Sequence, residues 1–141
     1  ATVQKLGLAP DILYGNVWMT GFIPMYLKTT YQKDPIFKDA KSVFTIYSNE
    51  FDFKFDADIV EKAKMLDIDD DMLASLKTAD FGGFIKMGME YADMVVKSDE
   101  DFSENMEALF TEYSTNKHIE QVAADDDLLT SYYALYTELA N

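Results

Sequence analysis

Residues 41–49 read Lys-Ser-Val-Phe-Thr-Ile-Tyr-Ser-Asn, and the architecture of the chain can be worked out from this short run. Its apolar members are β-branched or aromatic, and a polar segment begins at Ser48, which favours a buried strand over a helix. Helical patterns flank the run on both sides in sequence, so we predict the central strand of a parallel sheet with helices packed on its faces. In such sheets ligands gather where the strands end, and the loop from Tyr47 to Phe53 is therefore the first candidate for a functional site.

Strand and helix patterns alternate along the chain on either side of this strand. The most regular helical spacing of apolar residues runs from Leu128 to Leu139. Residues 51–55 alternate Phe with charged residues, and we interpret them as an extended loop. The other predicted strands are 11–15, 94–96 and 118–122, and the predicted helices are 1–6, 18–31, 59–66, 69–77, 84–93 and 102–113, the last of them capped by Ser98. This order predicts a three-layer, Rossmann-like α/β fold, a partial domain with a parallel sheet of three to four strands and helices on both faces.

Composition and charge exclude several classes of function. The chain has 141 residues, enough for a single domain, and 48% of them are hydrophobic, too many for a disordered chain. Twelve basic residues face 26 acidic ones, and the net charge of −14 repels phosphate backbones and anionic lipids, so we expect no nucleic-acid and no membrane binding. The absence of Cys excludes disulfides and thiolate metal sites, and fits a cytoplasmic protein. No signal pattern or membrane-spanning apolar run occurs.

Acidic triplets at residues 69–71 and 125–127 suggest a hard-cation site, but the spacing argues against one. A calcium loop starting at Asp67 fails because Met72 stands where the turn needs Gly, and Thr78 where a bidentate Glu is required. We interpret both triplets as carboxylates at helix starts, and we predict no metal and no cofactor. The single histidine, His118, is interpreted as an ordinary edge residue, since no nucleophile or phosphate-loop motif accompanies it.

Five colinear segments carry a family pattern. They are residues 10–20 (Pro-Asp-Ile-Leu-Tyr-Gly-Asn-Val-Trp-Met-Thr), 25–28 (Met-Tyr-Leu-Lys), 34–37 (Asp-Pro-Ile-Phe), 43–49 (Val-Phe-Thr-Ile-Tyr-Ser-Asn) and 83–96 (Gly-Phe-Ile-Lys-Met-Gly-Met-Glu-Tyr-Ala-Asp-Met-Val-Val). Together they resemble the N-terminal, starch synthase catalytic domain of bacterial glycogen and starch synthases. The resemblance extends over roughly residues 8–98.

The resemblance implies a glycosyltransferase of two Rossmann-like domains that transfers glucose from a nucleotide sugar, usually ADP-glucose, to an α-1,4-glucan in the cleft between the domains. It implies that residues 1–141 form a single domain, the latter half of the first of these two domains, with further strands before Ala1 and the second domain after Asn141. By position, the residues that would bind substrate are Asn16, Trp18, Thr20, Tyr47 and Asn49.

The sequence departs from the family at four positions where the family has histidine. Here those positions are occupied by Tyr14, Asn16, Met19 and Tyr47. A histidine that hydrogen-bonds a sugar hydroxyl, or stabilises the charge of a glucosyl transition state, is not replaced by Met or Tyr without loss. We therefore predict no catalytic residue and expect a fragment or degenerate relative that is inactive as this chain alone. Whether the intact protein is an enzyme stays open.

Two other hypotheses follow from the residues. One is a non-catalytic α/β scaffold for protein contacts or glucan binding. The other is an unrelated flavodoxin-like or receiver-like domain, but a receiver needs an acidic pair after its first strand, and Asp11 lies at the start of its strand. The expected partners are ADP-glucose and an α-1,4-glucan in the intact protein. A half domain also leaves a sheet edge unpaired, so we expect self-association or pairing with the missing half.

Overall fold

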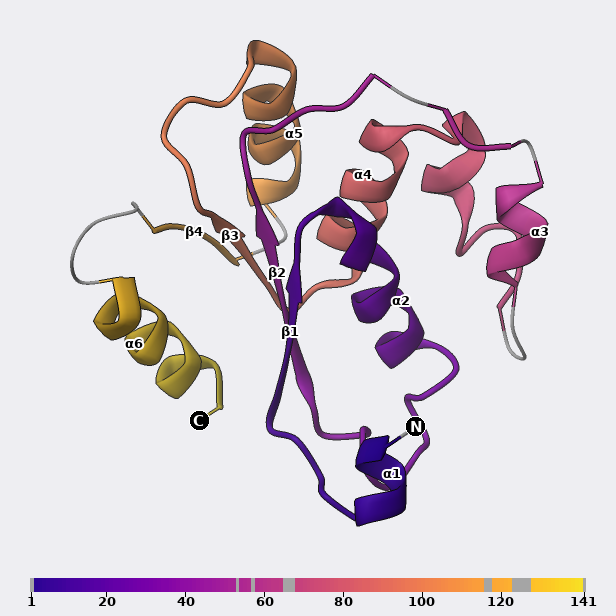
Figure 1. Cartoon of the computed structure of the whole chain (residues 1–141), viewed down its shortest axis with the longest axis vertical. Coiled ribbons are helices and arrows are strands. Elements are labelled where there is room, and N and C mark those ends of the chain that lie inside the picture. Colours follow the sequence, from indigo (N-terminus) through magenta and orange to yellow (C-terminus); the bar gives the residue numbers. More distant parts are fainter. Residues whose placement is uncertain are drawn as a thin grey trace.

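The computed structural model describes residues 2–52, 54–56, 58–64, 68–115, 118–122 and 128–140. Its elements in chain order are α1 (Thr2–Leu6), β1 (Ile12–Asn16), the 3₁₀ helix η1 (Trp18–Gly21), α2 (Phe22–Lys28), β2 (Lys41–Ile46), α3 (Ile59–Ala63), the 3₁₀ helix η2 (Ala74–Thr78), α4 (Phe81–Tyr91), β3 (Met94–Lys97), α5 (Glu104–Ser114), β4 (His118–Gln121) and α6 (Leu128–Ala140). The four strands form one sheet in the order β1-β2-β3-β4, and every neighbouring pair is parallel (Figure 1). The predicted α/β fold with a parallel sheet is confirmed.

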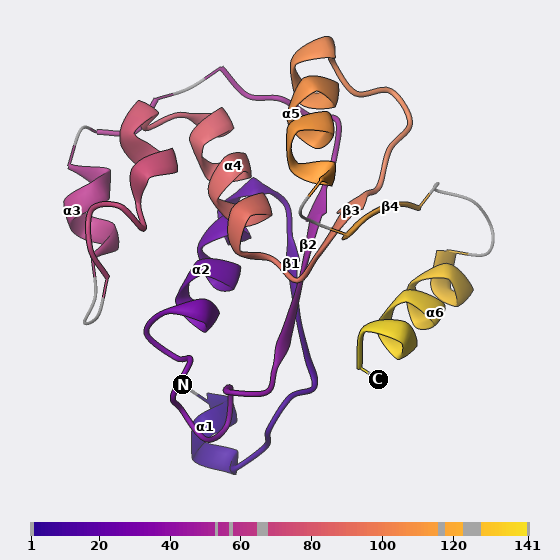
Figure 2. The ribbon, with the colours of Figure 1, turned by 180° about the vertical axis from the view of Figure 1, so that it is seen from behind.

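Helices cover both faces of this sheet, as predicted, but unequally. Helices α2, α4 and α5, which connect the strands, lie on one face, and α6 lies alone on the other (Figures 1 and 2). Right-handed crossovers place every connecting helix on the same face when strands are added in chain order in one direction. Helix α6 follows β4, the last strand of the described residues, and packs against the opposite face at Val43, Met94 and Val96. None of the helices in the described ranges is long and apolar enough to cross a membrane.

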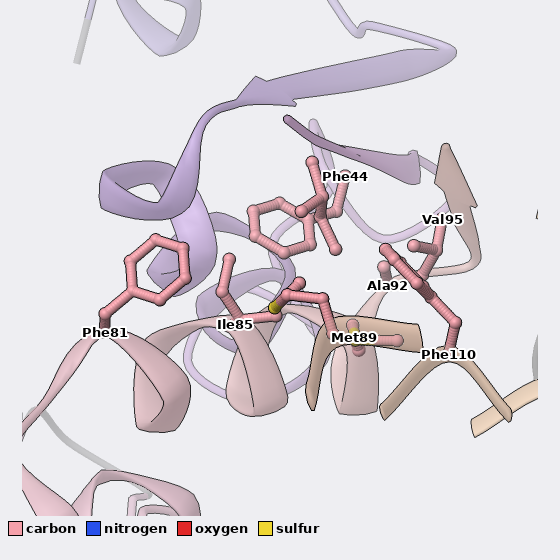
Figure 3. Close-up of a cluster of buried hydrophobic side chains, with 9 residues drawn as sticks. Phe44, Phe81, Ile85, Met89, Ala92, Val95 and Phe110 are labelled. Atoms are coloured by element: carbon pink, nitrogen blue, oxygen red, sulfur yellow. The ribbon is translucent and has the colours of Figure 1, made fainter. Parts of the chain in front are cut away.

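The alternation of side chains along β2 divides the core between the two faces. Phe44 and Ile46 point toward the connecting helices, where they join buried residues of α4 and α5 (Figure 3). Val43 points the other way and packs with the inner side of α6. Because β2 lies between two strands and is covered on both faces, five of its six residues are buried. The prediction of a central strand within residues 41–49 is thus confirmed, and the strand itself spans Lys41–Ile46.

Several predicted boundaries are wrong. Helix α2 ends at Lys28, not near Tyr31. Helix α5 begins at Glu104, and its cap is Ser103, whose side chain accepts a hydrogen bond from the N–H of Met106. Ser98 does not cap it because its own N–H donates to the carbonyl of Ile46, which leaves residues 99–103 to carry the chain to the helix start.

The first acidic triplet does act as a local cap, but of a turn. The Asp69 carboxylate accepts from the N–H groups of Asp71 and Met72, and the regular structure that follows is η2 rather than an α-helix over 69–77. Residues 51–52 and 54–55 are a loop as predicted, apart from an antiparallel bridge between Lys54 and Asp80. Phe53, residues 65–67 and the triplet at 125–127 lie outside the described residues.

Candidate functional site

A small pocket lies where β1 and β2 end. Parallel strands bring their carboxyl ends to the same edge of a sheet, so the segments that follow β1 and β2 meet there, above the start of α4. The pocket has a volume of about 160 Å³. Its lining residues are Val17, Trp18, Met19, Ile46, Tyr47, Asn49, Phe51, Phe81 and Ile85.

Trp18 forms the aromatic side of the pocket. Its ring centroid lies 6.2 Å from that of Phe51 and 6.4 Å from that of Phe81, both of which also line the pocket. On its other side it meets Phe84 in the core, edge to face, at 5.7 Å. The indole is therefore fixed between the core and the pocket, and its orientation follows from packing against α4.

The turn that carries Trp18 has unusual backbone geometry. Val17 has φ 62° and ψ 163°, a region that glycine adopts and that a β-branched residue rarely enters. Its N–H donates to the carbonyl of Thr45, and its own carbonyl accepts from the N–H and the hydroxyl of Thr20. These bonds hold the strained turn, and they place Val17 and Met19 at the pocket.

The opposite wall comes from the segment after β2. Tyr47, Asn49 and Phe51 line the pocket, and between the first two lies Ser48. The N–H and the hydroxyl of Ser48 both donate to one carboxylate oxygen of Asp99, at 2.6 and 2.8 Å. The wall is thus attached to the loop that follows β3.

The structure brings together three of the five predicted substrate-binding residues. Trp18, Tyr47 and Asn49 line one pocket. Thr20 lies beside it, where its Oγ1 is 2.8 Å from the carbonyl oxygen of Val17 and serves the turn. Asn16 is exposed at the end of β1 and does not line the pocket.

Sequence reasoning missed the residues that α4 supplies. Phe81 and Ile85 lie one helical turn apart and complete the floor of the pocket. Their spacing in the sequence indicates a core stripe, and nothing local separates that role from lining a pocket. Phe51 falls within the predicted loop, but its contact with Trp18 depends on the packed structure.

Tyr14, at the position of a family histidine, faces away from the pocket. Its ring lies 6.0 Å from that of Tyr132 and 6.1 Å from that of Tyr136, both on α6. Burial is the main cause that raises the pKa of Tyr14 well above its ordinary value; the neighbouring hydroxyl of Thr45 opposes the shift, and Tyr132 adds to it. This phenol is therefore neutral at physiological pH.

The pocket is suited to binding rather than to proton transfer. Among the residues that the structure describes, the lining includes no histidine, lysine or carboxylate, and its polar side chains are Tyr47, Asn49 and Trp18. General acid–base catalysis needs a group that titrates near the working pH. Within the part of the chain that the structure describes, no cluster of His, Asp or Glu side chains is arranged to hold a metal ion.

Comparison with known proteins gives the same family as the sequence segments. The sequence model of the family "Starch synthase catalytic domain" matches residues 1–121. A glycogen synthase of Clostridium perfringens is 30% identical over 120 residues, which are 79% of this chain and 25% of that protein. A glycogen synthase of Clostridium botulinum is 33% identical over 105 residues, 74% of this chain and 22% of that protein. One of Thermotoga maritima is 33% identical over 96 residues, covering 66% and 19%.

The chain thus spans about a quarter or less of the length of these relatives. The family match includes all four strands, the whole of α4 and α5 and therefore every segment that forms the pocket, while α6 lies beyond it. The chain belongs to the starch synthase catalytic domain family.

Proposed function

We propose that the pocket at Trp18 binds one glucosyl ring, of a nucleotide sugar such as ADP-glucose or of an α-1,4-glucan, in a cytoplasmic protein of the glycogen synthase type. The observation that carries the proposal is that Trp18, Tyr47 and Asn49, selected from the family positions, lie around one cavity at the carboxyl edge of the sheet. This chain supplies a binding surface for the sugar. It does not transfer glucose alone.

The chemistry of the lining fits a sugar. A pyranose ring has an apolar C–H face that packs against aromatic rings, and hydroxyl groups that need donors and acceptors. Trp18 and Phe51 supply the aromatic surface, and the amide of Asn49 and the phenol of Tyr47 supply polar contacts. The volume, about 160 Å³, lies below the range of about 300–1,000 Å³ that drug-sized ligands occupy, so the pocket holds a single ring.

The same lining argues against glucosyl transfer by this chain. The transition state of such a reaction develops positive charge on the sugar, and family histidines would stand near it. Here those positions carry Tyr14, which faces α6, and Asn16, Met19 and Tyr47. None of these side chains is the imidazole that general acid–base catalysis most often uses.

Titration of the chain with maltotriose and with ADP-glucose tests this proposal. Trp18 is the only tryptophan, so its fluorescence reports on the pocket directly. We expect saturable quenching by at least one of the two ligands, weakened at least fivefold by Asn49→Ala and unchanged by Asn105→Ala, which alters an exposed amide on α5. No change of Trp18 fluorescence with either ligand at millimolar concentration contradicts the proposal. A glucan elongation assay with both ligands should show no product.

A second candidate function, a scaffold that associates with another chain, is supported by the edge of β1. Within the described residues, β1 pairs with β2 alone. The carbonyl of Asp11 and the N–H of Val17 are bonded to β2. Along a strand of a parallel sheet, residues whose main-chain groups bond to the neighbouring strand alternate with residues whose main-chain groups point the other way. The main-chain groups of Ile12, Tyr14 and Asn16 therefore face the open edge.

The surroundings of this edge favour a second copy of the chain. An apolar groove of about 300 Å³ lies beside β1 on the α2 face, lined by Leu13, Ile23, Tyr26, Leu27, Tyr31, Phe37 and the amide of Gln4. Residues 1–41 carry five Lys and three acidic residues, a net charge of +2, whereas residues 42–141 carry seven Lys and 23 acidic residues, a net charge of −16. The β1 edge is therefore where like-charge repulsion between two copies is weakest.

Sedimentation at several concentrations and salt conditions tests this association. We expect a reversible dimer that Asn16→Pro weakens, because proline removes an N–H from the open edge, and that Asn16→Ala leaves intact. A monomer at all concentrations up to the millimolar range contradicts self-association. Binding of a different apolar strand peptide in its place points to a heterologous partner at the same edge.

A further inference from the structure

We propose that Asp99 is a positioning residue, which holds the pocket-lining segment from Tyr47 to Phe51 in the geometry that ligand binding requires. The inference rests on the proposed binding role of the pocket. Asp99 does not line the pocket itself, and it belongs to the acidic run Asp99-Glu100-Asp101, which in the sequence alone looks like a solvated loop.

The attachment is made just beyond the end of the ladder. Strand β2 ends at Ile46, whose carbonyl accepts from the N–H of Ser98 at 3.0 Å. Two residues further along, the Asp99 carboxylate takes over and accepts from both the N–H and the hydroxyl of Ser48. These bonds have a carboxylate oxygen as acceptor and lengths of 2.6 and 2.8 Å, which places them among the shorter hydrogen bonds in proteins.

Asp99 is itself fixed from the other side by β4. The side-chain amide of Gln121 donates to the carbonyls of Asp99, at 2.7 Å, and of Lys97, at 3.2 Å. The N–H of Val122 donates to Lys97 as well, at 2.8 Å. The carboxylate that holds Ser48 is therefore anchored to a neighbouring strand, and it can transmit the position of β3 and β4 to the pocket.

The pocket depends on this attachment because Ser48 stands between two lining residues. Tyr47 precedes it and Asn49 follows it, and Phe51 is two residues further along. Among the described residues, the segment is next tied down at Phe55, whose N–H donates to the carbonyl of Ala79. Loss of the carboxylate leaves the N–H of Ser48 without its acceptor and lets Asn49 and Phe51 leave the pocket wall.

The experiment compares Asp99→Ala, Asp99→Asn and, as a matched acidic control on the same loop, Glu100→Ala. The first readout is acrylamide quenching of Trp18 in the unliganded protein. We expect Asp99→Ala to raise the quenching constant about twofold or more, Glu100→Ala to leave it unchanged, and Asp99→Asn, whose amide oxygen can still accept from Ser48, to stay near the wild-type value. Ser48→Ala, which removes only the hydroxyl contact, should give a smaller increase.

A purely structural role for Asp99 makes a different prediction. The control is Asp93→Asn, which alters a carboxylate that contacts Lys28 and Ser42 at the end of the sheet opposite the pocket. This variant should have a lower melting temperature but an unchanged quenching constant, so the two effects can be separated. The positioning role is wrong if the quenching constant of Asp99→Ala equals that of the wild type, or if Asp93→Asn raises the quenching constant as much as Asp99→Ala does. Should Asp99→Ala fail to fold, Ser48→Ala and Asp99→Asn decide the question by the same readout.

The second readout is affinity. Where wild-type protein binds maltotriose, Asp99→Ala should weaken binding at least fivefold and Asp99→Asn less than twofold. Wild-type protein that binds neither maltotriose nor ADP-glucose contradicts the proposed function, but the quenching result on unliganded protein still decides the role of Asp99.

Discussion

The ammonium of Lys28 lies 2.6 Å from a carboxylate oxygen of Asp93, at the end of the sheet opposite the pocket. The second oxygen of Asp93 accepts from the N–H and the hydroxyl of Ser42. One carboxylate thus joins the end of α2, the start of β2 and the turn before β3. Lys28 and Asp93 both belong to segments that resemble the synthase family, and here their position shows that they stabilise the fold and take no part in the pocket.

Replacement of Asp93 by Ala, which removes both acceptor oxygens, should lower the free energy of unfolding by about 1.5–3 kcal/mol, the range for hydrogen bonds to a charged group. The Asp93 side chain is only 17% exposed, so water cannot fully replace its partners. Lys28 is 37% exposed, and Lys28→Met should cost less, about 0.5–1 kcal/mol, because solvent screens the ion pair. Urea denaturation measures both; equal losses would contradict the dominant role of Ser42.

The stability that the Asp93 carboxylate contributes should depend on pH. Burial raises the pKa of Asp93, but the hydrogen bonds from Lys28 and Ser42 and the charge of Lys28 outweigh burial, and the pKa lies below its ordinary value of 3.8. A depressed pKa contributes stability above the unfolded-state value and loses it as the pH falls through the folded-state value. The stability difference between wild type and Asp93→Asn should therefore be constant above about pH 5 and shrink below about pH 4.

Gly88 on α4 lies against the ring of Phe44 on β2, and it offers a test of the packing between the two elements. A Cβ added there would lie within 2.7 Å of three ring carbons of Phe44, too close for any real contact. Gly88→Ala should therefore lower the free energy of unfolding by about 1–3 kcal/mol. Gly82, in the first turn of the same helix, is the control, because the nearest atom to an added Cβ is 3.6 Å away. Gly82→Ala should be stabilising by about 0.5–1 kcal/mol through helix propensity. A thermal melt that ranks the two variants in the opposite order contradicts the packing.

The fold followed from local patterns more readily than the pocket did. The apolar run at Val43 to Ile46 identifies a buried strand, because it places apolar side chains on both faces of the strand and both faces must then be covered. The choice between Ser98 and Ser103 as the cap of α5 is different, since both are able caps and the hydrogen bond of Ser98 to Ile46 decides it. Likewise the roles of Phe81 and Asp99 depend on which segments come into contact in the folded chain, and these contacts cannot be deduced from the spacing of residues in the sequence.

The strained backbone at Val17 predicts that replacing this residue by glycine stabilises the protein. A β-branched residue at φ 62° and ψ 163° is strained by about 1–3 kcal/mol, and glycine relieves that strain while it loses about 0.5–1 kcal/mol to the entropy of the unfolded chain. Val17→Gly should therefore raise the free energy of unfolding by about 1 kcal/mol. Val17→Ala, which keeps the Cβ, should bring no such gain, and chemical denaturation of the pair is the measurement. Destabilisation by both substitutions would mean that the Val17 side chain contributes more by packing than the backbone loses by strain.

Tyr136 predicts how the attachment of α6 responds to alkaline pH. Burial, followed by the electrostatic influence of Tyr132 and Tyr47, raises the pKa of Tyr136 from 10.0 to about 12. A raised pKa means that the neutral phenol is favoured in the folded state, so its contribution is fully present below the unfolded-state value and is lost as the pH rises through about 12. Stability should fall between about pH 10 and 12, and less steeply in Tyr136→Phe than in the wild type. Absorbance of tyrosinate followed with pH, alongside circular dichroism, measures both events. A phenol at Tyr136 that ionises near its ordinary value of 10.0, before any loss of structure, would show that α6 does not bury it against the sheet.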